Sequence, residues 1–311
     1  MAVASRPPAD TTRGAAPRRP LGRALRAVPW LLPAGLLIFG VVLFPAGFLI
    51  FNSTRRIGLS GLDQGSAGLE NYNQLLTGYS LTRVLFNSLV WVIAVVVLTV
   101  VISLAIAQLL NSAFPGRRIV RIAVLVPWAA SVVMTTLTFV YGLDPFYGVI
   151  NRLLVDLNIL DQPYGFTKRA LPAFISAIGV AIFVSLPFTT YTILAGLAGV
   201  PHEVLEAARI DGAGPGRMYF KVVLPYLRGA IALATLINVI NVFNSLPILK
   251  LMTGSIPGNS ADTTTTMVFK ILQGERNIGV ASALSVVNFI IVLVVIALYL
   301  VVVKPMKSIE D

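Results

Sequence analysis

Six apolar runs dominate the pattern of hydrophobic and polar positions along the chain. They occupy residues 30–51, 86–110, 122–141, 171–194, 230–249 and 282–303, and none of them contains Lys, Arg, Asp or Glu. A helix of about 20 residues, rising 1.5 Å per residue, crosses a hydrocarbon core of about 30 Å. Residues 92–101 lack the two-residue alternation of lipid-facing barrel strands. The pattern therefore predicts an all-α membrane protein with six transmembrane helices.

The composition agrees with a membrane protein and excludes several kinds of chemistry. Of the 311 residues, 56% are apolar and 12% are charged, whereas soluble domains carry about 25% charged residues. The chain has no cysteine and one histidine, His202, which excludes thiol catalysis, disulfides and zinc clusters. No glycine precedes a lysine, so the phosphate-binding loop of ATPases is absent. We therefore expect no catalytic residue, no metal site and no cofactor bound by this chain.

The distribution of basic residues predicts the orientation. With residues 1–29 inside, 15 of the 24 lysines and arginines lie in cytoplasmic segments, which places both termini in the cytoplasm. We expect residues 1–29 to be a disordered basic tail, residues 30–303 the membrane domain and residues 304–311 a second cytoplasmic tail. A twin-arginine signal at Arg18-Arg19 is the alternative, but the following run is long and has no clear cleavage site. The charges lie between apolar runs, so the net charge of +11 does not indicate nucleic acid.

The predicted cytoplasmic segment 196–229 is the longest inner loop. Pro201 suits the first position of a helix, Glu203 and Glu206 suit the positive end of its dipole, and the glycine-rich run 211–216 breaks it. These features predict two short helices around a sharp turn. The apolar residues of the loop exceed what a solvated linker needs, which indicates that something packs on it; they are Val204, Leu205, Ala208, Val222, Val223 and Leu224.

The spacing in this loop resembles the EAA motif of bacterial ABC importer permeases, E-A-A-x3-G-x9-I-x-L-P. Glu206-Ala207-Ala208, Gly212 and Leu224-Pro225 match it throughout, and Val222 replaces the usual isoleucine. The resemblance implies a type I permease fold whose coupling helix docks into a cytoplasmic ATPase subunit, where ATP and Mg bind. The residues implied in ATPase coupling are Glu206, Ala207, Ala208, Asp211, Gly212, Leu224 and Pro225. Glu206 is suited to pairing with a basic group of that partner, although a helix-dipole role is the simpler alternative.

The resemblance extends to carbohydrate importers of the maltose and trehalose type, over about residues 25 to 305. Val126-Pro127-Trp128 and Leu251-Met252-Thr253-Gly254 carry it, while Ser255-Ile256-Pro257 departs from the usual Gly-Gly-Pro. It implies import of a di- or oligosaccharide across the bacterial cytoplasmic membrane. The implied partners are a second, different six-span permease, two ATPase subunits, an extracytoplasmic binding protein or lipoprotein, the sugar and membrane lipid.

Polar side chains within the apolar runs mark a candidate substrate path. Asn238, Asn241, Asn244 and Ser245 lie within about 120° of one helix face, and Ser282, Ser285 and Asn288 form a similar arc on the last span. Neutral amides and hydroxyls suit an uncharged, hydroxyl-rich solute, and Phe188 and Tyr191 are candidates for stacking on a sugar ring. The alternative is that these side chains join neighbouring helices by hydrogen bonds. Three prolines, Pro127, Pro187 and Pro247, lie where they would interrupt spans.

Three other functions are alternatives to a sugar permease. An ABC permease for another solute has the same EAA motif. An ion-coupled secondary transporter commonly needs carboxylates within its spans, and a membrane-embedded enzyme needs a nucleophile or an acid–base pair there. The six runs contain no Asp or Glu, which favours an ATP-driven permease.

Overall fold

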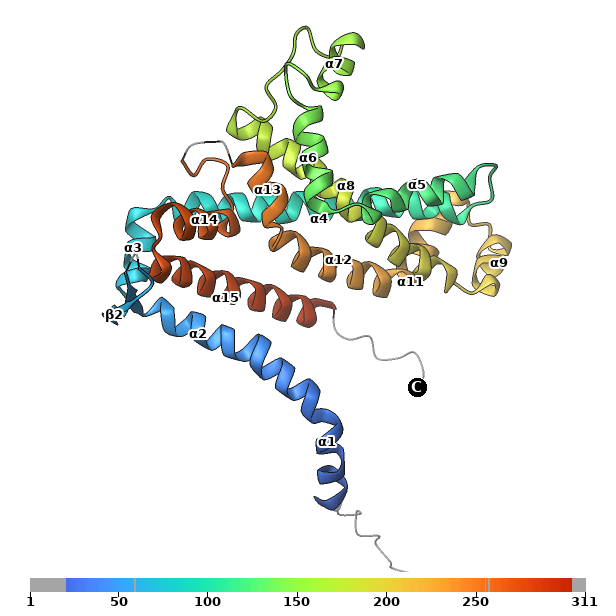
Figure 1. The fold of residues 1–311 in the computed structure, drawn as a ribbon. Coiled ribbons are helices and arrows are strands. Elements are labelled where there is room, and N and C mark those ends of the chain that lie inside the picture. Colours follow the sequence, from blue (N-terminus) through green and yellow to red (C-terminus); the bar gives the residue numbers. More distant parts are fainter. Residues whose placement is uncertain (1–20, 59, 255, 257, 304–311) are drawn as a thin grey trace, which may run out of the picture. The chain divides into compact units, whose positions relative to one another are not determined.

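The computed structural model describes residues 21–58, 60–254, 256 and 258–303 (Figure 1). The predicted tail 304–311, residues 1–20 and Pro257 lie outside the described residues. Residues up to Phe48 form one unit and residues from Leu49 onward form another.

The first unit is a helix with exposed apolar side chains. It contains α1 (Leu21–Leu37), the π-helical segment η1 (Ile38–Leu43) and the start of α2 (Phe44–Ser53). Trp30 is 86% exposed and Phe39 is 62% exposed, as expected of side chains that face lipid. The prediction of a disordered tail through residue 29 is wrong for residues 21–29, because leucine, alanine and arginine there are strong helix formers that extend the helix toward the N-terminus.

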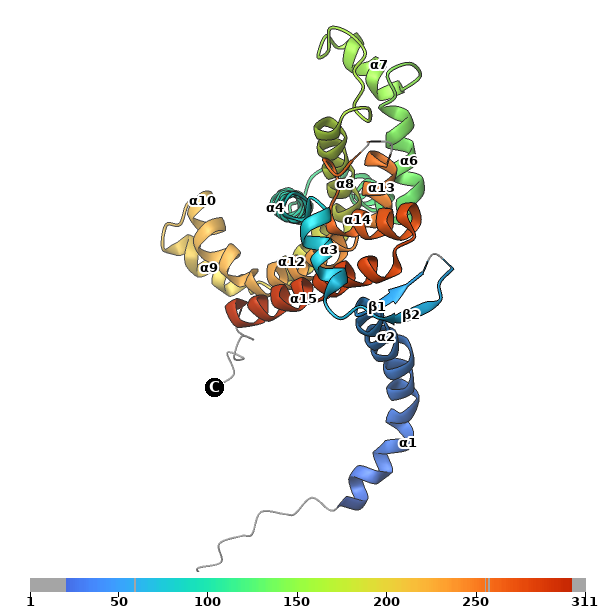
Figure 2. The ribbon, with the colours of Figure 1, turned by 90° about the vertical axis from the view of Figure 1, so that its left-hand side faces the viewer.

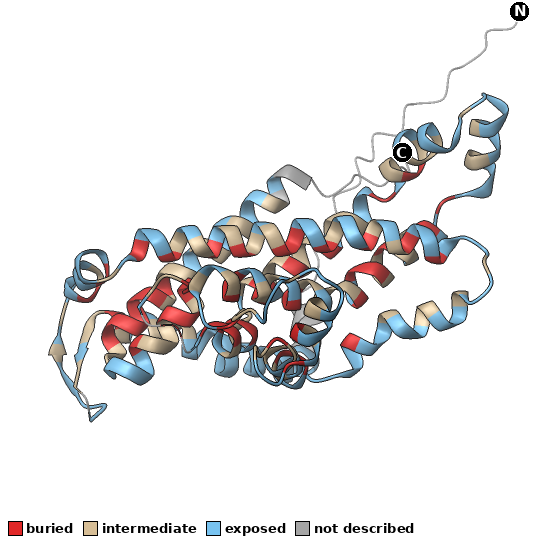
Figure 3. Ribbon diagram, turned by 90° about the horizontal axis from the view of Figure 1, so that it is seen from above, coloured by how far each residue is buried: buried red, intermediate tan, exposed pale blue. Residues whose placement is uncertain are grey.

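Three long helices form the framework of the second unit: α4 (Leu81–Asn111), α8 (Ala170–Ala198) and α15 (Ile278–Val303). Buried residues recur along the helices and alternate with exposed positions (Figure 3). The largest core cluster centres on Trp91 of α4 and Phe174 of α8. The Trp91 indole Nε1 donates to the Val242 carbonyl at 2.8 Å, so the side chain is both packed and hydrogen-bonded.

The predicted third and fifth spans are interrupted. The third consists of α5 (Arg117–Ala129) and α6 (Val132–Gly142), which are bent by 98°. The fifth consists of α12 (Arg228–Phe243) and a separate α13 (Leu246–Thr253). Among the described residues, four helices are long and apolar enough to cross a membrane. The number rises to as many as six if two bent pairs each count as one span: α5 with α6, and the helical segment Pro215–Tyr226 with α12. This confirms a mostly helical membrane protein.

Prolines account for where these interruptions occur. Pro127 lacks a backbone N–H, and α5 ends two residues later, before the extended residues Ala130 and Ser131. Pro247 lies in the first turn of α13, directly after the second interruption, where its missing N–H costs nothing. Pro187, by contrast, lies inside the continuous α8. Two of the three prolines predicted to interrupt spans therefore accompany a break.

The predicted outer segments contain short elements. They are α3 (Glu70–Gly78), α7 (Val149–Asp156), α14 (Thr264–Lys270), η3 (Ile271–Glu275) and an antiparallel hairpin of β1 (Arg55–Ile57) and β2 (Asp63–Ser66) (Figure 2). The all-α prediction did not include the hairpin. Arg55 and Asp63 bridge its strands with an N–O distance of 2.6 Å. This ion pair holds the pKa of Asp63 below its ordinary value, and the Gly65 backbone N–H acts in the same direction.

Candidate functional site

The loop between α8 and α12 folds as the sequence predicts, with two helical segments around a glycine-rich turn. Helix α9 (His202–Ile210) comes first, and α10 (Pro215–Arg217), η2 (Met218–Val223) and α11 (Leu224–Tyr226) continue into one another. Pro201 is the N-cap of α9 rather than its first helical residue. In Figure 1, α9 lies at the opposite end of the long helix α4 from α3.

The turn after α9 requires a glycine at position 212. Gly212 has φ = 73°, a left-handed conformation that L side chains rarely adopt. Its N–H donates to the Arg209 carbonyl at 3.0 Å, and the Ala213 N–H donates to the Ala208 carbonyl at 3.0 Å. These two bonds satisfy carbonyls at the end of α9 in a Schellman motif. The motif gives a physical reason for the fixed spacing between the alanine pair and the glycine.

One side of the loop packs against the framework helices. Leu205 of α9 and Val223 of η2 contribute to a core cluster with Ala107 of α4 and Ile193 of α8. Gly196 lies so close to α12 that an added Cβ would be 2.6 Å from the Cβ of Ala230. Part of the apolar excess in the loop is therefore explained by this chain's own packing. For Leu205 and Val223, the packing that the sequence predicts for this loop is supplied by α4 and α8 of the same chain.

The other side of α9 is exposed and forms what we call the docking face: Glu203, Glu206, Ala207 and Ile210. These residues recur at the spacing of one helix face, and Ile210 is 87% exposed. Glu206 takes part in none of the four ion pairs found among the described residues. An exposed isoleucine beside two unpaired carboxylates suits a partner with an apolar patch and a basic rim.

The remaining predicted coupling residues belong to the same loop as the docking face. Asp211 is exposed, Ala208 is half-buried, and Leu224 and Pro225 are half-buried beside a groove of about 760 Å³. Phe220, which is 67% exposed, lies on the same groove. Neither Ile210 nor Phe220 is among the residues predicted from the sequence. Ile210 could have been predicted as an exposed contact residue, because it lies outside the apolar stripe of this short amphipathic helix.

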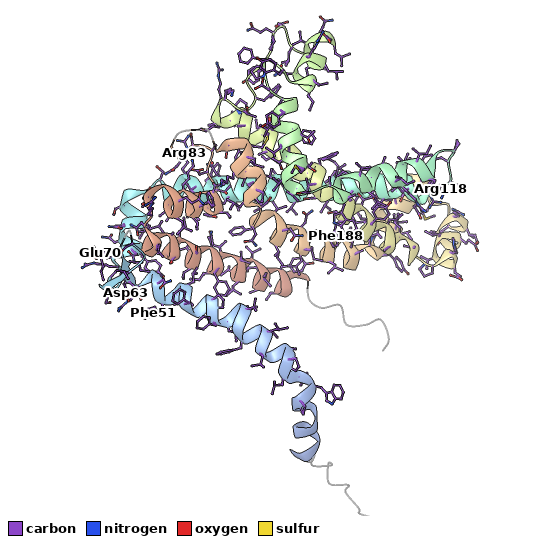
Figure 4. All side chains as sticks on the ribbon, in the orientation of Figure 1. Phe51, Asp63, Glu70, Arg83, Arg118 and Phe188 are labelled. Carbon is purple, nitrogen blue, oxygen red and sulfur yellow. The ribbon has the colours of Figure 1, made fainter. Side chains whose placement is uncertain are left out.

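A cavity of about 340 Å³ lies among α5, α6, α8, α12 and α13. Phe188, which is labelled in Figure 4, and Trp128 contribute aromatic rings to it. Its polar lining residues are Ser185, Asn238, Asn241 and Ser245. Two of the six predicted substrate-path residues, Asn238 and Asn241, therefore share one cavity.

Asn238 and Tyr191 join helices by hydrogen bonds. The Asn238 Nδ2 donates to the hydroxyl of Thr189 at 3.1 Å, which connects α12 to α8. The Tyr191 hydroxyl donates to the Arg121 carbonyl at 2.8 Å, which connects α8 to α5. For these two residues the structure contains the helix-joining alternative, and Asn238 also lines the cavity.

The other predicted path residues are not part of this cavity. Asn244 donates from Nδ2 to the Ile240 carbonyl at 2.9 Å, because α12 ends there and its carbonyls need partners. Ser285 donates to the Ala281 carbonyl at 2.9 Å within α15. The Oδ1 atom of Asn288 is buried and accepts no hydrogen bond from the described residues. The predicted arc of Asn238, Asn241 and Asn244 does not persist as one face, since the helix stops at Phe243.

The described residues contain no group of three or more His, Cys, Asp or Glu side chains placed to hold a metal ion. The charged groups of the loop are exposed and the cavity contains only neutral side chains. The arrangement is therefore suited to docking a partner and to holding an uncharged solute, with no acid–base or nucleophilic pair in the cavity.

Comparisons with known proteins agree with this arrangement. The profile described as "Binding-protein-dependent transport system inner membrane component" matches residues 18–307. A probable ABC transporter permease protein of Brucella suis is 31% identical over 277 residues, covering 88% of this chain and 96% of that protein. A trehalose transport system permease protein of Mycobacterium tuberculosis is 29% identical, covering 83% of this chain and 81% of that protein.

A solved structure has the same fold. A chain of the crystal structure of a bacterial alginate ABC transporter, in complex with an alginate pentasaccharide-bound periplasmic protein, superimposes with a TM-score of 0.80. The match covers 93% of this chain and 97% of that chain, at 19% sequence identity.

Proposed function

The chain belongs to the family of binding-protein-dependent transport system inner membrane components, and from this premise we propose that it imports a di- or oligosaccharide together with a second permease and two ATPase subunits. It is a multi-pass inner-membrane transport subunit of an ABC transporter and not an enzyme. The observation that carries the proposal is the docking face of α9, held by the Gly212 turn and left exposed by the framework helices.

The docking face couples ATP hydrolysis to movement of the spans. Leu205 and Val223 fix the inner side of the loop to α4 and α8, so a displacement of the loop is transmitted to both helices. Glu206 and Ile210 remain free to contact the ATPase subunit. Closure of the ATPase dimer on ATP moves the loop, and the spans open outward to receive solute. Binding energy at the docking face thereby selects one of two conformations of the transporter.

A saccharide is the solute that the cavity favours. Asn241 and Ser245 offer hydrogen-bonding groups to hydroxyls, and Phe188 and Trp128 offer apolar ring surface. None of the described residues that line this cavity is Lys, Arg, Asp or Glu, which fits an uncharged solute. The relative from Mycobacterium tuberculosis is named for trehalose transport. We therefore assign a trehalose- or maltose-like sugar as the first solute to test.

The coupling role is tested by replacing Glu206 with lysine in the assembled transporter. We expect Glu206→Lys to lower ATP-dependent sugar uptake into proteoliposomes and the recovery of the ATPase subunit with a tagged chain. The matched control is Asp156→Lys, which reverses an exposed carboxylate on α7, far along the chain from the docking face. Normal uptake and normal ATPase recovery in Glu206→Lys, or an equal loss in the control, would remove the coupling role. Recovery of the tagged chain without any ATPase subunit would remove the proposed assembly.

The solute assignment has a separate test. Asn241 lies in the cavity, whereas Asn244, three residues later, bonds to its own helix end. We expect Asn241→Ala to raise the sugar concentration needed for half-maximal uptake while Asn244→Ala leaves it nearly unchanged. Equal behaviour of the two variants contradicts a solute site in this cavity. Uptake that stops with a proton uncoupler while ATP is maintained supports the ion-coupled alternative.

A further inference from the structure

A second cavity, which we call the outer pocket, lies between α13, α14 and η3 on the predicted outer side of the membrane. Its volume is about 420 Å³. Figure 1 shows α14 near α3, at the opposite end of α4 from α9. The rim is open, because Lys250, Gln273 and Glu275 line the pocket and are exposed. None of its described lining residues also lines the cavity that contains Asn241. The outer pocket is therefore a separate site that faces the outside.

Hydrogen bonds within the chain fix the walls of the outer pocket. Asp262 is 1% exposed, and its Oδ2 lies 2.8 Å from the Lys270 Nζ, so this buried carboxylate already has an ionic partner. Lys270 also donates to the Gly258 carbonyl at 2.9 Å. Asn87 of α4 donates from Nδ2 to the carbonyls of Ser260 and Asp262, at 3.2 and 2.9 Å. A pocket held in this way needs little ordering when a partner binds.

Two charges of the outer pocket have no ionic partner in the part of the chain that the structure describes. The Lys250 Nζ lies 3.7 Å from the centroid of the Phe269 ring, a cation–π contact that positions the ammonium but leaves its charge in place. Glu275 accepts a hydrogen bond from the neutral Tyr79 hydroxyl. Neither Lys250 nor Glu275 belongs to any of the four ion pairs found among the described residues. The pocket thus offers one cation and one anion to a ligand.

This charge pattern favours a protein partner over the transported sugar. An uncharged solute needs neither an ammonium nor a carboxylate, and the cavity proposed for it is neutral. A pocket of a few hundred Å³ accepts the tip of a loop and is too small for a folded domain. The family to which the chain belongs depends on a binding protein, which approaches from the outer side. Charges of opposite sign at an interface fix the orientation of a partner.

We propose that the outer pocket anchors the extracytoplasmic binding protein, which places a carboxylate against Lys250 and a basic group against Glu275. The Phe269 ring holds the ammonium at the pocket wall, so little side-chain freedom is lost when the carboxylate arrives. The inference rests on the proposed function, and it adds the residues and the charge pattern that the binding protein must match. Because both residues are exposed, we expect their contribution to depend on ionic strength.

Binding of the purified binding protein of the same transport system to the full-length assembly in nanodiscs tests the proposal. Affinity is measured by surface plasmon resonance, with and without ATP, at low and high salt. At low salt we expect Lys250→Ala to weaken binding about tenfold and Glu275→Gln about threefold, and both effects to shrink at high salt. Glutamine still accepts the Tyr79 hydrogen bond, so the second variant removes mainly charge. Lys168→Ala, at an exposed lysine of another predicted outer segment, is the control and should change little.

A zero-length cross-link identifies the contact directly. Carbodiimide joins a lysine amine to a carboxylate that touches it, and peptide mapping by mass spectrometry identifies both residues. We expect a product that joins Lys250 to a carboxylate of the binding protein. Lys250→Arg keeps the positive charge but does not form this product, so it should lose the cross-link while it retains most of the affinity.

The outcomes separate this inference from the proposed function. An unmodified assembly that does not bind the binding protein would remove both. Normal binding with unchanged affinity in Lys250→Ala and Glu275→Gln would remove the anchor alone. An equal loss in Lys168→Ala would show that only the overall charge of the outer face matters. A cross-link from Lys250 to another membrane subunit would assign the pocket to an interface within the transporter. If Lys250→Ala does not assemble, Glu275→Gln and the cross-link decide the result.

Discussion

Adding one methyl group at Gly212 tests the turn on which the docking face depends. In Gly212→Ala the new Cβ meets no atom within 4 Å, so the substitution causes no clash. The cost comes from φ = 73°, since the left-handed region is unfavourable for an L residue by about 1–2 kcal/mol. Part of this is offset because alanine restricts the unfolded chain. We expect the free energy needed to open the turn to fall by about 1 kcal/mol. The population of molecules with an open turn then rises about fivefold.

Gly216→Ala is the matched control, because it adds the same methyl group four residues later. No atom lies within 4 Å of that Cβ either, and Gly216 lies inside the helical turn Pro215–Arg217. Alanine is favoured over glycine in a helix by about 0.5–1 kcal/mol, so this variant should be neutral or slightly stabilising. The two substitutions are therefore expected to have opposite signs within one loop.

Hydrogen exchange of the loop amides measures the effect directly. The Gly212 and Ala213 N–H groups donate the two bonds that close the turn, so their exchange reports on its opening. We expect about fivefold faster exchange in Gly212→Ala, weaker recovery of the ATPase subunit, and no acceleration in Gly216→Ala. Asparagine, which tolerates this backbone region better than alanine does, should give an intermediate rate at position 212. Equal exchange rates in the two alanine variants would refute the argument that the backbone angle of Gly212 maintains the docking face.

Two further predictions concern packing and pH. Gly196→Ala places a Cβ 2.6 Å from the Cβ of Ala230, so we expect about 1–3 kcal/mol of destabilisation, seen as a lower melting temperature in detergent. Gly179→Ala on the same helix meets no atom within 4 Å and should leave the melting temperature unchanged or raise it slightly, since alanine is favoured over glycine inside a helix. The lowered pKa of Asp63, caused first by the Arg55 side chain, means that the hairpin gains stability above the carboxyl's ordinary pKa and loses it as pH falls through the lowered value. Arg55→Gln should raise that pKa, which carbon NMR of the labelled carboxyl would detect; an unchanged value would contradict the assignment.

The long spans and the coupling loop were predictable because each depends on local information. Apolar length alone identifies α4, α8 and α15, and the glycine spacing after Ala207-Ala208 identifies a turn whose hydrogen bonds are within the loop itself. The exposure of Ile210 on the docking face was harder to predict from the sequence. Ile210 is exposed because the opposite side of α9, with Leu205, faces α4 and α8. That orientation depends on the cluster that Leu205 forms with Ala107 and Ile193, which lie about a hundred and about ten positions earlier in the chain.

Which of the polar span residues share one cavity was predicted less well, because it depends on the ends of helices. A regular helix carries Asn238, Asn241 and Asn244 on one side, but α12 stops after Phe243 and directs Asn244 to its own Ile240 carbonyl. Hydropathy does not register such a stop, since the residues after it are still apolar. The proline at position 247 indicated an interruption, yet its position fits a kink as well as a new helix.

The two interrupted spans meet at the same cavity, and this connects the irregular backbone with the proposed transport function. Trp128 precedes the first break and Val132 follows it, while Asn241 precedes the second break and Ile248 follows it, and all four line the cavity. A helix end leaves backbone groups without partners, which is tolerated within a membrane where they face protein or a water-filled space. A cavity bordered by two such breaks can offer backbone as well as side-chain hydrogen bonds to a hydroxyl-rich solute. The prolines near both breaks are thus placed to shape a binding site, beyond any role in bending the spans.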